Sequence, residues 1–240
     1  MQIEENEPSN QVPKNISIVP SLMCTDLLNL EQEVKRIEEL GIKMLHIDVI
    51  DGNFSPSMPL GLETVRQLRK KTKLDFDVHL MVNNNEFFVE QMIDLGAQRI
   101  CFHVEVEKHI SKLLTQIKSH KISAGVALSP ATPISVLEYI IEQCDFILLM
   151  GINPGYATFA GEGKVSYIKR KIKDCSTLIK AQQRNTSIAI DGRVSFDDLI
   201  PFAEAGADTF VGGTSSLFQP EMPLDKNWNR IKEILSSIQK

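Results

Sequence analysis

The chain has 240 residues, with 31 aspartates and glutamates against 26 lysines and arginines, and a formal net charge of −5 at pH 7. This acidic balance argues against nucleic acid as the main partner, because proteins that bind nucleic acid usually carry a basic patch. No apolar run approaches the ~20 residues that span a bilayer, and the polar N-terminus lacks the apolar centre of a signal peptide. We therefore expect a cytoplasmic protein that binds neither nucleic acid nor a membrane.

The cysteines are expected to be reduced thiols. No two of them form a CxxC pair, and each lies in or beside an apolar stretch. Mostly buried, unpaired thiols are the usual state of such cysteines in a cytoplasmic protein. They are Cys24, Cys101, Cys144 and Cys175.

Strand and helix patterns alternate from residue 16 to the C-terminus. Eight short apolar runs predict strands at 16–20, 43–49, 74–80, 99–104, 123–128, 146–150, 187–190 and 209–211. The patterns that follow them predict helices at 27–40, 59–71, 86–95, 110–117, 133–141, 163–183, 195–206 and 228–238. Asp26 and Ser195 are expected to cap two of these helices, and Gly41 and Gly206 to end them.

This alternation of strands and helices defines the expected fold. Strands that are each followed by a helix form a parallel sheet with right-handed crossovers. Eight such units in a chain of this length predict an α/β fold of the closed (β/α)8 TIM barrel type. The G-x-G-x-x-G signature of a dinucleotide-binding sheet is absent after the first strand. We expect a flexible N-terminal tail over residues 1–15 and a single barrel domain over residues 16–240.

Four polar residues mark the expected active site, which in such barrels lies at the carboxyl ends of the strands. His46 and Asp48 are two residues apart on the second strand and so project from the same face. His79 lies on the third strand, and Asp191 ends the seventh. A lone strand histidine is more often a hydrogen-bonded core residue. Two imidazoles and two carboxylates at one barrel mouth instead favour a divalent metal ion, zinc first, or iron, manganese or cobalt.

The remaining histidines are less suited to bind metal. His103 and Glu105 follow the fourth strand, and we expect them to hydrogen-bond around the site or within a loop. His109 and His120 lie on or beside a predicted helix and are expected at the surface.

Glycine-containing loops follow strands six, seven and eight, at 153–155, 191–192 and 212–215. Glycine lets the backbone approach a ligand closely, and the loops after strands seven and eight are the frequent phosphate site of this fold. Each loop alone is also explained by a tight turn, so the loops support a phosphate site chiefly in combination.

These motifs resemble the ribulose-phosphate 3-epimerase family, which includes a D-allulose-6-phosphate 3-epimerase branch. The matching segments run in family order from about residue 16 to 235. They are 20–23 (PSLM), 46–52 (HIDVIDG), 77–82 (DVHLMV), 125–133 (GVALSPATP), 150–155 (MGINPG), 190–192 (IDG) and 206–218 (GADTFVGGTSSLF).

The resemblance implies a TIM barrel of the ribulose-phosphate-binding type and a set of functional residues. By resemblance, the metal ligands are His46, Asp48, His79 and Asp191, and the acid/base pair is Asp48 and Asp191. The implied substrate contacts are Ser21, His79, Met81, Met150, Gly155, Gly192, Gly213 and Thr214. The implied reaction removes the C3 proton of a phosphorylated ketose and passes through an enediolate stabilised by the cation. A homodimer or homohexamer is also implied.

The sequence departs from the family pattern around the expected phosphate site. The family usually reads N-P-G-F-G-G-Q after strand six, where this chain has Asn153-Pro-Gly-Tyr-Ala-Thr-Phe159. Arg193 follows Gly192, where the family often has a second glycine, and it either supplies a phosphate charge or points to solvent. Ile50 stands where the family usually has methionine. The metal and proton-carrying residues are unchanged.

Three functions fit these observations to different degrees. Epimerisation of ribulose 5-phosphate to xylulose 5-phosphate, a step of the pentose phosphate pathway, is the default. D-allulose 6-phosphate is a close rival, because PSLMC (20–24), GTSSLF (213–218) and Trp228 look more like that branch. A non-catalytic sugar-phosphate-binding protein is the third. A decarboxylase or synthase of a related barrel is disfavoured, because residues 77–82 lack the lysine of a D-x-K-x-x-D pattern.

Overall fold

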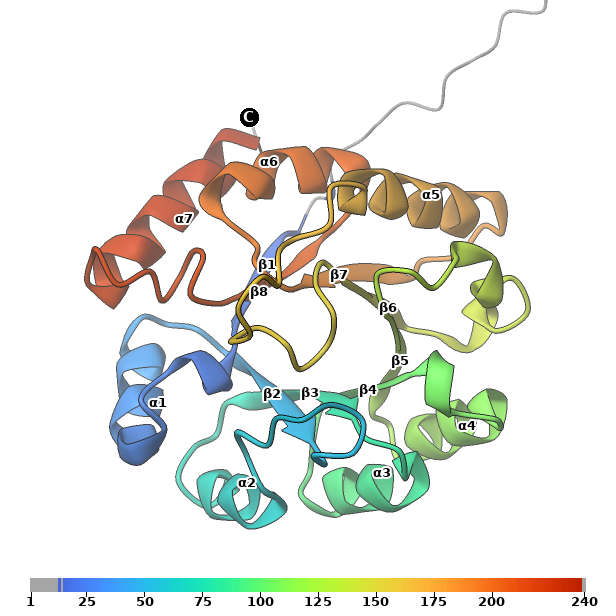
Figure 1. Cartoon of the computed structure of the whole chain (residues 1–240), viewed down its shortest axis with the longest axis horizontal. Helices are drawn as coiled ribbons and strands as arrows, with labels where there is room; N and C mark the ends of the chain where they lie inside the picture. Colours follow the sequence, from blue (N-terminus) through green and yellow to red (C-terminus); the bar gives the residue numbers. More distant parts are fainter. Residues whose placement is uncertain (1–12, 14, 239–240) are drawn as a thin grey trace, which may run out of the picture.

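The computed structural model describes residue 13 and residues 15–238, so the tail predicted over residues 1–15 lies largely outside the described residues. Eight parallel strands form the sheet, in the order β1-β8-β7-β6-β5-β4-β3-β2. Figure 1 shows them as a ring with the helices outside it, and the predicted α/β barrel is confirmed. The strands are β1 (Ser17–Pro20), β2 (Met44–Ile50), β3 (Asp75–Met81), β4 (Arg99–His103), β5 (Ser123–Leu128), β6 (Phe146–Met150), β7 (Ser187–Asp191) and β8 (Thr209–Gly212).

The ring closes between β1 and β2 through a single parallel bridge, which joins Ser21 to His46. Elsewhere neighbouring strands share ladders of paired residues; β2 and β3, for example, pair from Met44 opposite Asp75 to Ile50 opposite Met81. The closing bridge therefore lies toward the carboxyl end of the barrel and includes His46, one of the two predicted ligands on β2.

Seven α-helices surround the barrel within the described part of the chain. They are α1 (Leu30–Glu39), α2 (Leu62–Arg69), α3 (Asn85–Asp94), α4 (Ile110–Ser119), α5 (Ile168–Ala181), α6 (Phe196–Ala205) and α7 (Leu224–Ile238). The predicted helix ends at α6 are confirmed: Ser195 and Asp198 form a capping box, and Gly206 ends the helix at a φ of 116°. Asp26 also caps as predicted, but it caps a short 3-10 turn, Leu27–Asn29, that precedes α1.

Two helix predictions are wrong in part. The segment 133–141 is not an α-helix; it holds two 3-10 turns, Ile134–Leu137 and Ile141–Gln143. The β-branched residues Ile134, Val136, Ile140 and Ile141 disfavour a regular helix, and short i→i+3 turns take its place. The helix predicted at 163–183 begins only at Ile168, because residues 151–167 form a loop over the barrel mouth.

The core has two parts, one between the strands and the helices and a smaller one inside the barrel. The inner cluster consists of Cys101, Ala127, Phe146, Leu148, Met150 and Ala189. Gly125 leaves room for the Phe146 ring, because a Cβ there would lie 2.6 Å from a ring carbon. Arg99 places its guanidinium 4.0 Å from the centre of the same ring. The barrel interior is thus filled below the site.

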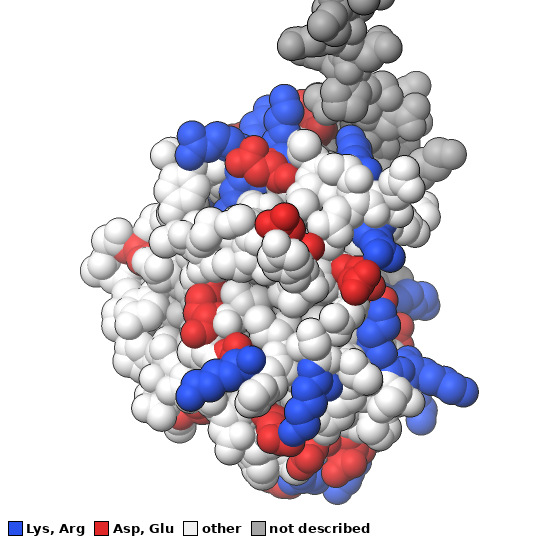
Figure 2. Space-filling view, turned by 90° about the vertical axis from the view of Figure 1, so that its right-hand side faces the viewer, with Lys and Arg blue, Asp and Glu red and all other residues white. Residues whose placement is uncertain are grey.

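The outer surface carries charges of both signs. Figure 2 shows lysines and arginines interspersed with aspartates and glutamates on the face turned to the viewer, with no continuous basic patch there. His109 and His120 are exposed, as predicted. All four cysteines are free; Cys24 is half-buried and the other three are buried. Among residues 15–238, no helix has the length and apolar character needed to cross a membrane.

Candidate active site

Four predicted ligands meet at the carboxyl end of the barrel. His46 and Asp48 come from β2, His79 from β3 and Asp191 from the end of β7, and one ligand atom of each lies within 4.8 Å of the others. Asp48 Oδ1 is 3.3 Å from His46 Nε2 and also 3.3 Å from His79 Nδ1. Asp191 Oδ2 is 3.9 Å from His46 Nε2 and 3.6 Å from His79 Nδ1. Two nitrogens and two oxygens therefore face one common point.

The surroundings of His46 show that this cluster fits a metal ion. Nδ1 of His46 lies 2.8 Å from Asp77 Oδ2, and Asp77 Oδ1 lies 3.3 Å from Arg99 Nε. Asp77 therefore orients the imidazole from behind, as carboxylates commonly do for metal-bound histidines. Nε2 of His46 is buried and has no hydrogen-bond partner. A buried nitrogen that faces two carboxylates and lacks a partner is suited to ligate a cation.

The charges of the cluster are strongly coupled. Burial lowers the pKa of His46, but the Asp48 and Asp77 carboxylates outweigh it and raise that pKa well above its ordinary value. Burial likewise opposes the ionisation of Asp48, yet His46 and His79 lower its pKa. For His79, burial is outweighed by Asp191 and Asp48, so its pKa is raised. Two carboxylates here hold positive charge tightly, and a divalent cation competes with protons for the same position.

His103 and Glu105 lie behind this cluster, as the sequence predicts. Nε2 of His103 is 2.9 Å from Nε2 of His79, and Nδ1 of His103 is 2.9 Å from Glu105 Oε2. Burial lowers the pKa of His103 to about 4, so this imidazole is neutral near pH 7. Because His103 points at the rear nitrogen of His79, it does not face the four-atom cluster.

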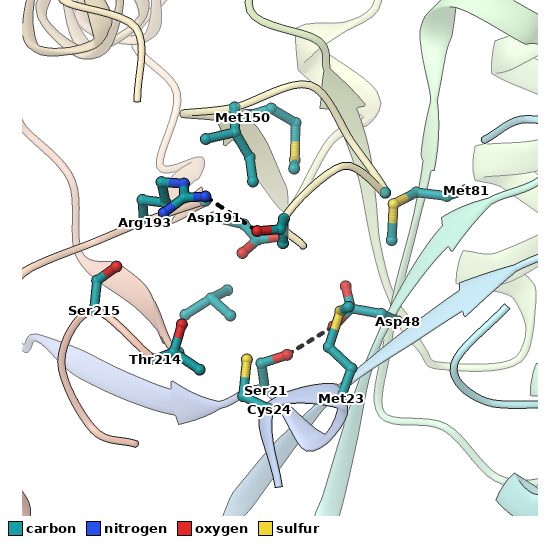
Figure 3. Close-up of a pocket in the computed structure, with 16 residues that line it drawn as sticks. Ser21, Met23, Cys24, Asp48, Met81, Met150, Asp191, Arg193, Thr214 and Ser215 are labelled. Atoms are coloured by element: carbon teal, nitrogen blue, oxygen red, sulfur yellow. Dashed lines mark hydrogen bonds between the residues drawn. The ribbon is translucent and has the colours of Figure 1, made fainter. Parts of the chain in front are cut away.

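A pocket opens in front of the cluster, and Figure 3 shows its lining residues as sticks. Ser21 directly follows β1, and its Oγ donates a hydrogen bond of 2.8 Å to Asp48 Oδ2. Met81 ends β3 and Met150 ends β6, and both are buried. The lining residues are Ser21, Met23, Cys24, Asp48, Met81, Met150, Ile152, Gly155, Ala157, Asp191, Gly192, Arg193, Val211, Gly213, Thr214 and Ser215. All the residues predicted to contact substrate line this pocket except His79, which is buried beside Asp48.

Close approach of the backbone explains two of the lining glycines. Gly155 has a φ of +82°, and a Cβ at this position would lie 1.9 Å from Ser55 Oγ. Gly192 has a φ of +104°, and its Cβ would lie 2.9 Å from the backbone nitrogen of Ile152. The loops that follow β2, β6 and β7 therefore touch at these positions. Gly213 is followed by a segment of turns and not directly by a helix, since α7 begins only at Leu224.

The Arg193 side chain lines the pocket and is also exposed to solvent. It has a φ of +53°, which is uncommon for a residue other than glycine. Its Nη2 donates to the backbone oxygen of Ala157 at 3.1 Å, as the dashed line in Figure 3 shows. Among the described residues that line the pocket, Arg193 is the only lysine or arginine. The sequence left its direction open, and the structure turns the guanidinium toward the loop after β6.

Several lining residues were not predicted. Those that the sequence did not single out are Met23, Cys24, Ile152, Ala157, Val211 and Ser215. All six lie one to three residues from a predicted substrate contact, so they would have been found by including the sequence neighbours of each predicted residue. Asp77 had no predicted role. Its contact with His46 is a cross-strand relationship, since the two residues are directly opposite in the β2–β3 ladder.

Comparison with known proteins gives the family. Residues 17–218 match the model of the ribulose-phosphate 3 epimerase family. The chain is 34% identical over 209 residues to ribulose-phosphate 3-epimerase from Synechocystis sp., which covers 86% of this chain and 90% of that protein. It is 33% identical to ribulose-phosphate 3-epimerase from Serratia marcescens, over 87% of this chain and 98% of that protein. Fold and site thus define an isomerase of the epimerase type on a (β/α)8 barrel. The chain belongs to the ribulose-phosphate 3-epimerase family.

Solved structures share the fold at lower sequence identity. 3-Hexulose-6-phosphate synthase from Salmonella typhimurium superimposes with a TM-score of 0.67 at 12% identity, covering 93% of this chain and 100% of that one. 3-Keto-L-gulonate-6-phosphate decarboxylase from Vibrio cholerae gives a TM-score of 0.66 at 13% identity, over 94% and 99% of the two chains. At these identities the likeness concerns the barrel alone.

Proposed function

We propose that this protein is a metal-dependent ketose-phosphate 3-epimerase whose default reaction converts ribulose 5-phosphate to xylulose 5-phosphate. One observation carries the proposal: Asp48 from β2 and Asp191 from β7 both line the pocket and both contribute to the four-atom cluster. Epimerisation at C3 needs a proton carrier on each face of the ketose. Carboxylates from two strands that are not neighbours in the sheet can supply one on each side.

The two carboxylates divide the proton transfers between them. One removes the C3 proton, which is acidic because it lies next to the C2 carbonyl, and the other delivers a proton to the opposite face. Ser21 holds Oδ2 of Asp48 and so leaves Oδ1 toward the reaction centre. A divalent cation held by His46, Asp48, His79 and Asp191 would supply positive charge for the developing enediolate oxygens. Zinc is the proposed metal, with iron, manganese and cobalt as alternatives.

The methionines are proposed to shield the reaction centre. Met81 and Met150 are each 2% exposed, and Figure 3 places both beside the carboxylates. Their thioether side chains are apolar and adaptable, so they can cover the planar intermediate without donating a proton to it. Exclusion of water strengthens the electrostatic interactions within such a site.

The phosphate is proposed to bind at the other end of the pocket. Gly192, Gly213 and Thr214 line the pocket, as does Gly155 in the loop after β6, and we propose that their backbone N–H groups bind the phosphate. Arg193 adds a positive charge next to that loop, which carries Ala157 and Thr158 in place of glycines. A guanidinium can bind a phosphate through two parallel hydrogen bonds, and we propose this role for Arg193.

A turnover assay on two sugar phosphates tests the proposal. The purified, zinc-loaded protein should epimerise ribulose 5-phosphate and exchange the C3 hydrogen with deuterium from solvent, as followed by NMR. Faster turnover of D-allulose 6-phosphate would assign the hexulose phosphate as substrate. Binding of either sugar without any C3 exchange would overturn the epimerase proposal in favour of a non-catalytic sugar-phosphate-binding protein. The homodimer or homohexamer and the cytoplasmic location expected from the sequence stay predictions.

A further inference from the structure

A chain of hydrogen bonds runs from the predicted metal-ligand cluster to the protein surface. It begins at His79, whose Nε2 lies 2.9 Å from His103 Nε2, and it continues from His103 Nδ1 to Glu105 Oε2 at 2.9 Å. His79 and His103 are both fully buried, whereas Glu105 is partly exposed. His46 has a shorter support, which is a direct contact with Asp77. The two histidines of the cluster are therefore oriented in different ways.

The positions of the protons in this chain follow from geometry. Nδ1 is the His79 nitrogen that faces Asp48 and Asp191. It can ligate a metal only through its lone pair, so the single ring proton of neutral His79 must lie on Nε2. That N–H can donate only if Nε2 of His103 is unprotonated. The proton of His103 then lies on Nδ1 and is donated to Glu105.

Glu105 is fixed so that it accepts this proton with one particular oxygen. Oε1 accepts from the backbone nitrogen of Ser129 at 2.7 Å and from the Thr132 hydroxyl. Lys171 holds the same loop, because its Nζ donates to the backbone oxygens of Ser129 at 2.6 Å and Pro130 at 3.0 Å. Oε2 is therefore the oxygen left for His103.

Packing fixes the ring of His103 as well. The Phe54 ring lies 4.8 Å from it, centre to centre, at an interplanar angle of 40°. The Ser129 hydroxyl, at 3.5 Å from Nδ1, is too distant to compete strongly with the carboxylate.

We propose that Glu105 and His103 are positioning residues, which hold His79 as the tautomer whose Nδ1 lone pair points at the metal site. This inference rests on the metal dependence proposed above. Partners behind metal ligands typically contribute about 10–100-fold to metal affinity or activity. Here Glu105 acts on His79 through the intervening imidazole of His103. A hydrogen-bond acceptor at the protein surface therefore determines the tautomer of a buried metal ligand.

The variant Glu105→Gln tests the direction of hydrogen-bond donation from His79 through His103 to residue 105, with almost no change in the shape of the side chain. The amide oxygen must take the place of Oε1, because the Ser129 N–H can only donate. The amide NH2 then takes the place of Oε2 and donates to Nδ1 of His103, which moves the His103 proton to Nε2. Two N–H groups would then meet between His103 and His79, and His79 is favoured with its proton on Nδ1, where it blocks the metal. Zinc affinity should fall by about 10–100-fold.

Glu107→Gln is the matched control. Glu107 lies two residues further along and accepts from the His109 backbone nitrogen at 2.7 Å and from Asn85 Nδ2 at 3.3 Å. It has no contact with His103, so its zinc affinity should equal that of the wild type. His103→Gln, which can still accept at one end and donate at the other, should retain more affinity than His103→Leu.

The readouts are zinc affinity, measured by chelator competition, and the imidazole 15N shifts of the zinc-loaded protein. In the wild type we expect a proton on His103 Nδ1. In Glu105→Gln we expect that proton on Nε2 and weakened zinc binding, with the fold retained by circular dichroism. Wild-type zinc affinity in Glu105→Gln, or a His103 proton on Nε2 in the wild type, would overturn the positioning role and leave the epimerase proposal intact. Failure of the wild type to bind zinc, iron, manganese or cobalt would overturn both.

Discussion

Ser21 and Asp48 come from the two strands between which the barrel closes, and Ser21 Oγ donates a hydrogen bond of 2.8 Å to Asp48 Oδ2 (Figure 3). The carboxylate is thereby held with its other oxygen toward His46 and His79. We predict that Ser21→Ala lowers kcat by about 10–100-fold, because Asp48 gains freedom to rotate away. Steady-state kinetics would check this, with Ser236→Ala on α7 as the control. Unchanged kcat in Ser21→Ala would contradict an orienting role for Ser21.

Asp48 and Asp191 should each be indispensable for proton transfer. An amide cannot accept the C3 proton, so Asp48→Asn and Asp191→Asn should each abolish C3 deuterium exchange. Both variants should remain folded, because each keeps the shape of the side chain. NMR of the sugar in deuterated solvent gives the exchange rate, and circular dichroism checks the fold. Exchange near the wild-type rate in either variant would refute the acid/base pair.

Arg193 should act on phosphate affinity rather than on the chemical step. Arg193→Gln should raise KM by about 10–100-fold, which corresponds to the ~1.5–3 kcal/mol typical of hydrogen bonds to charged groups. kcat should change little, because Arg193 contacts the loop after β6 rather than the carboxylates. Arg170→Gln, at an exposed position on α5, is the control. An equal KM in both variants would place Arg193 outside the phosphate site.

Gly155 should not tolerate a side chain. In Gly155→Ala the new Cβ would overlap Ser55 Oγ, and the φ of +82° is unfavourable for alanine. We predict a loss of about 1–3 kcal/mol in the free energy of unfolding, together with reduced activity, since Gly155 lines the pocket. Gly163→Ala is the control, because a Cβ there meets no atom within 4 Å. Adding Ser55→Gly should recover part of the stability by removing the overlap but not the strained φ.

Lys171 should make stability depend on alkaline pH. Burial lowers the pKa of Lys171 from 10.5 to about 8. Between these two pH values the unfolded chain holds a proton at this residue that the folded chain has lost. The free energy of unfolding should therefore rise with pH there, by up to about 3 kcal/mol. Lys171→Met should lack this rise, and Lys173→Met, at an exposed position of the same helix, should retain it.

Urea unfolding at pH 7, 8, 9 and 10 would measure the Lys171 effect. Parallel pH profiles for the wild type and Lys171→Met would show that Lys171 keeps an ordinary pKa. At pH 7 the variant should also lose stability, because the Ser129 and Pro130 oxygens lose their donor.

The barrel and its ligand cluster were predictable from the sequence for a common reason. Strand periodicity places His46 and Asp48 on one face, and parallel strands bring their carboxyl ends together. The helix predicted at 133–141 was wrong because it rested on apolar spacing, whereas the β-branched residues of this segment disfavour a regular helix and it forms 3-10 turns. The contacts of His79 with His103 and of Arg193 with Ala157 depend on side-chain rotamers and loop paths. No spacing rule encodes those.

The single bridge between Ser21 and His46 has a consequence for how the protein opens. Strand β1 is paired to β8 by a full ladder but to β2 only at this point, so the ring is expected to part here first. Parting would separate Ser21 from Asp48 while the seven ladders between the other pairs of neighbouring strands remain intact. Substrate held between these strands would resist such opening, since ligands that bind only the closed form stabilise it. Loss of catalysis on heating should therefore precede loss of helix content, and bound sugar phosphate should bring the two transitions together.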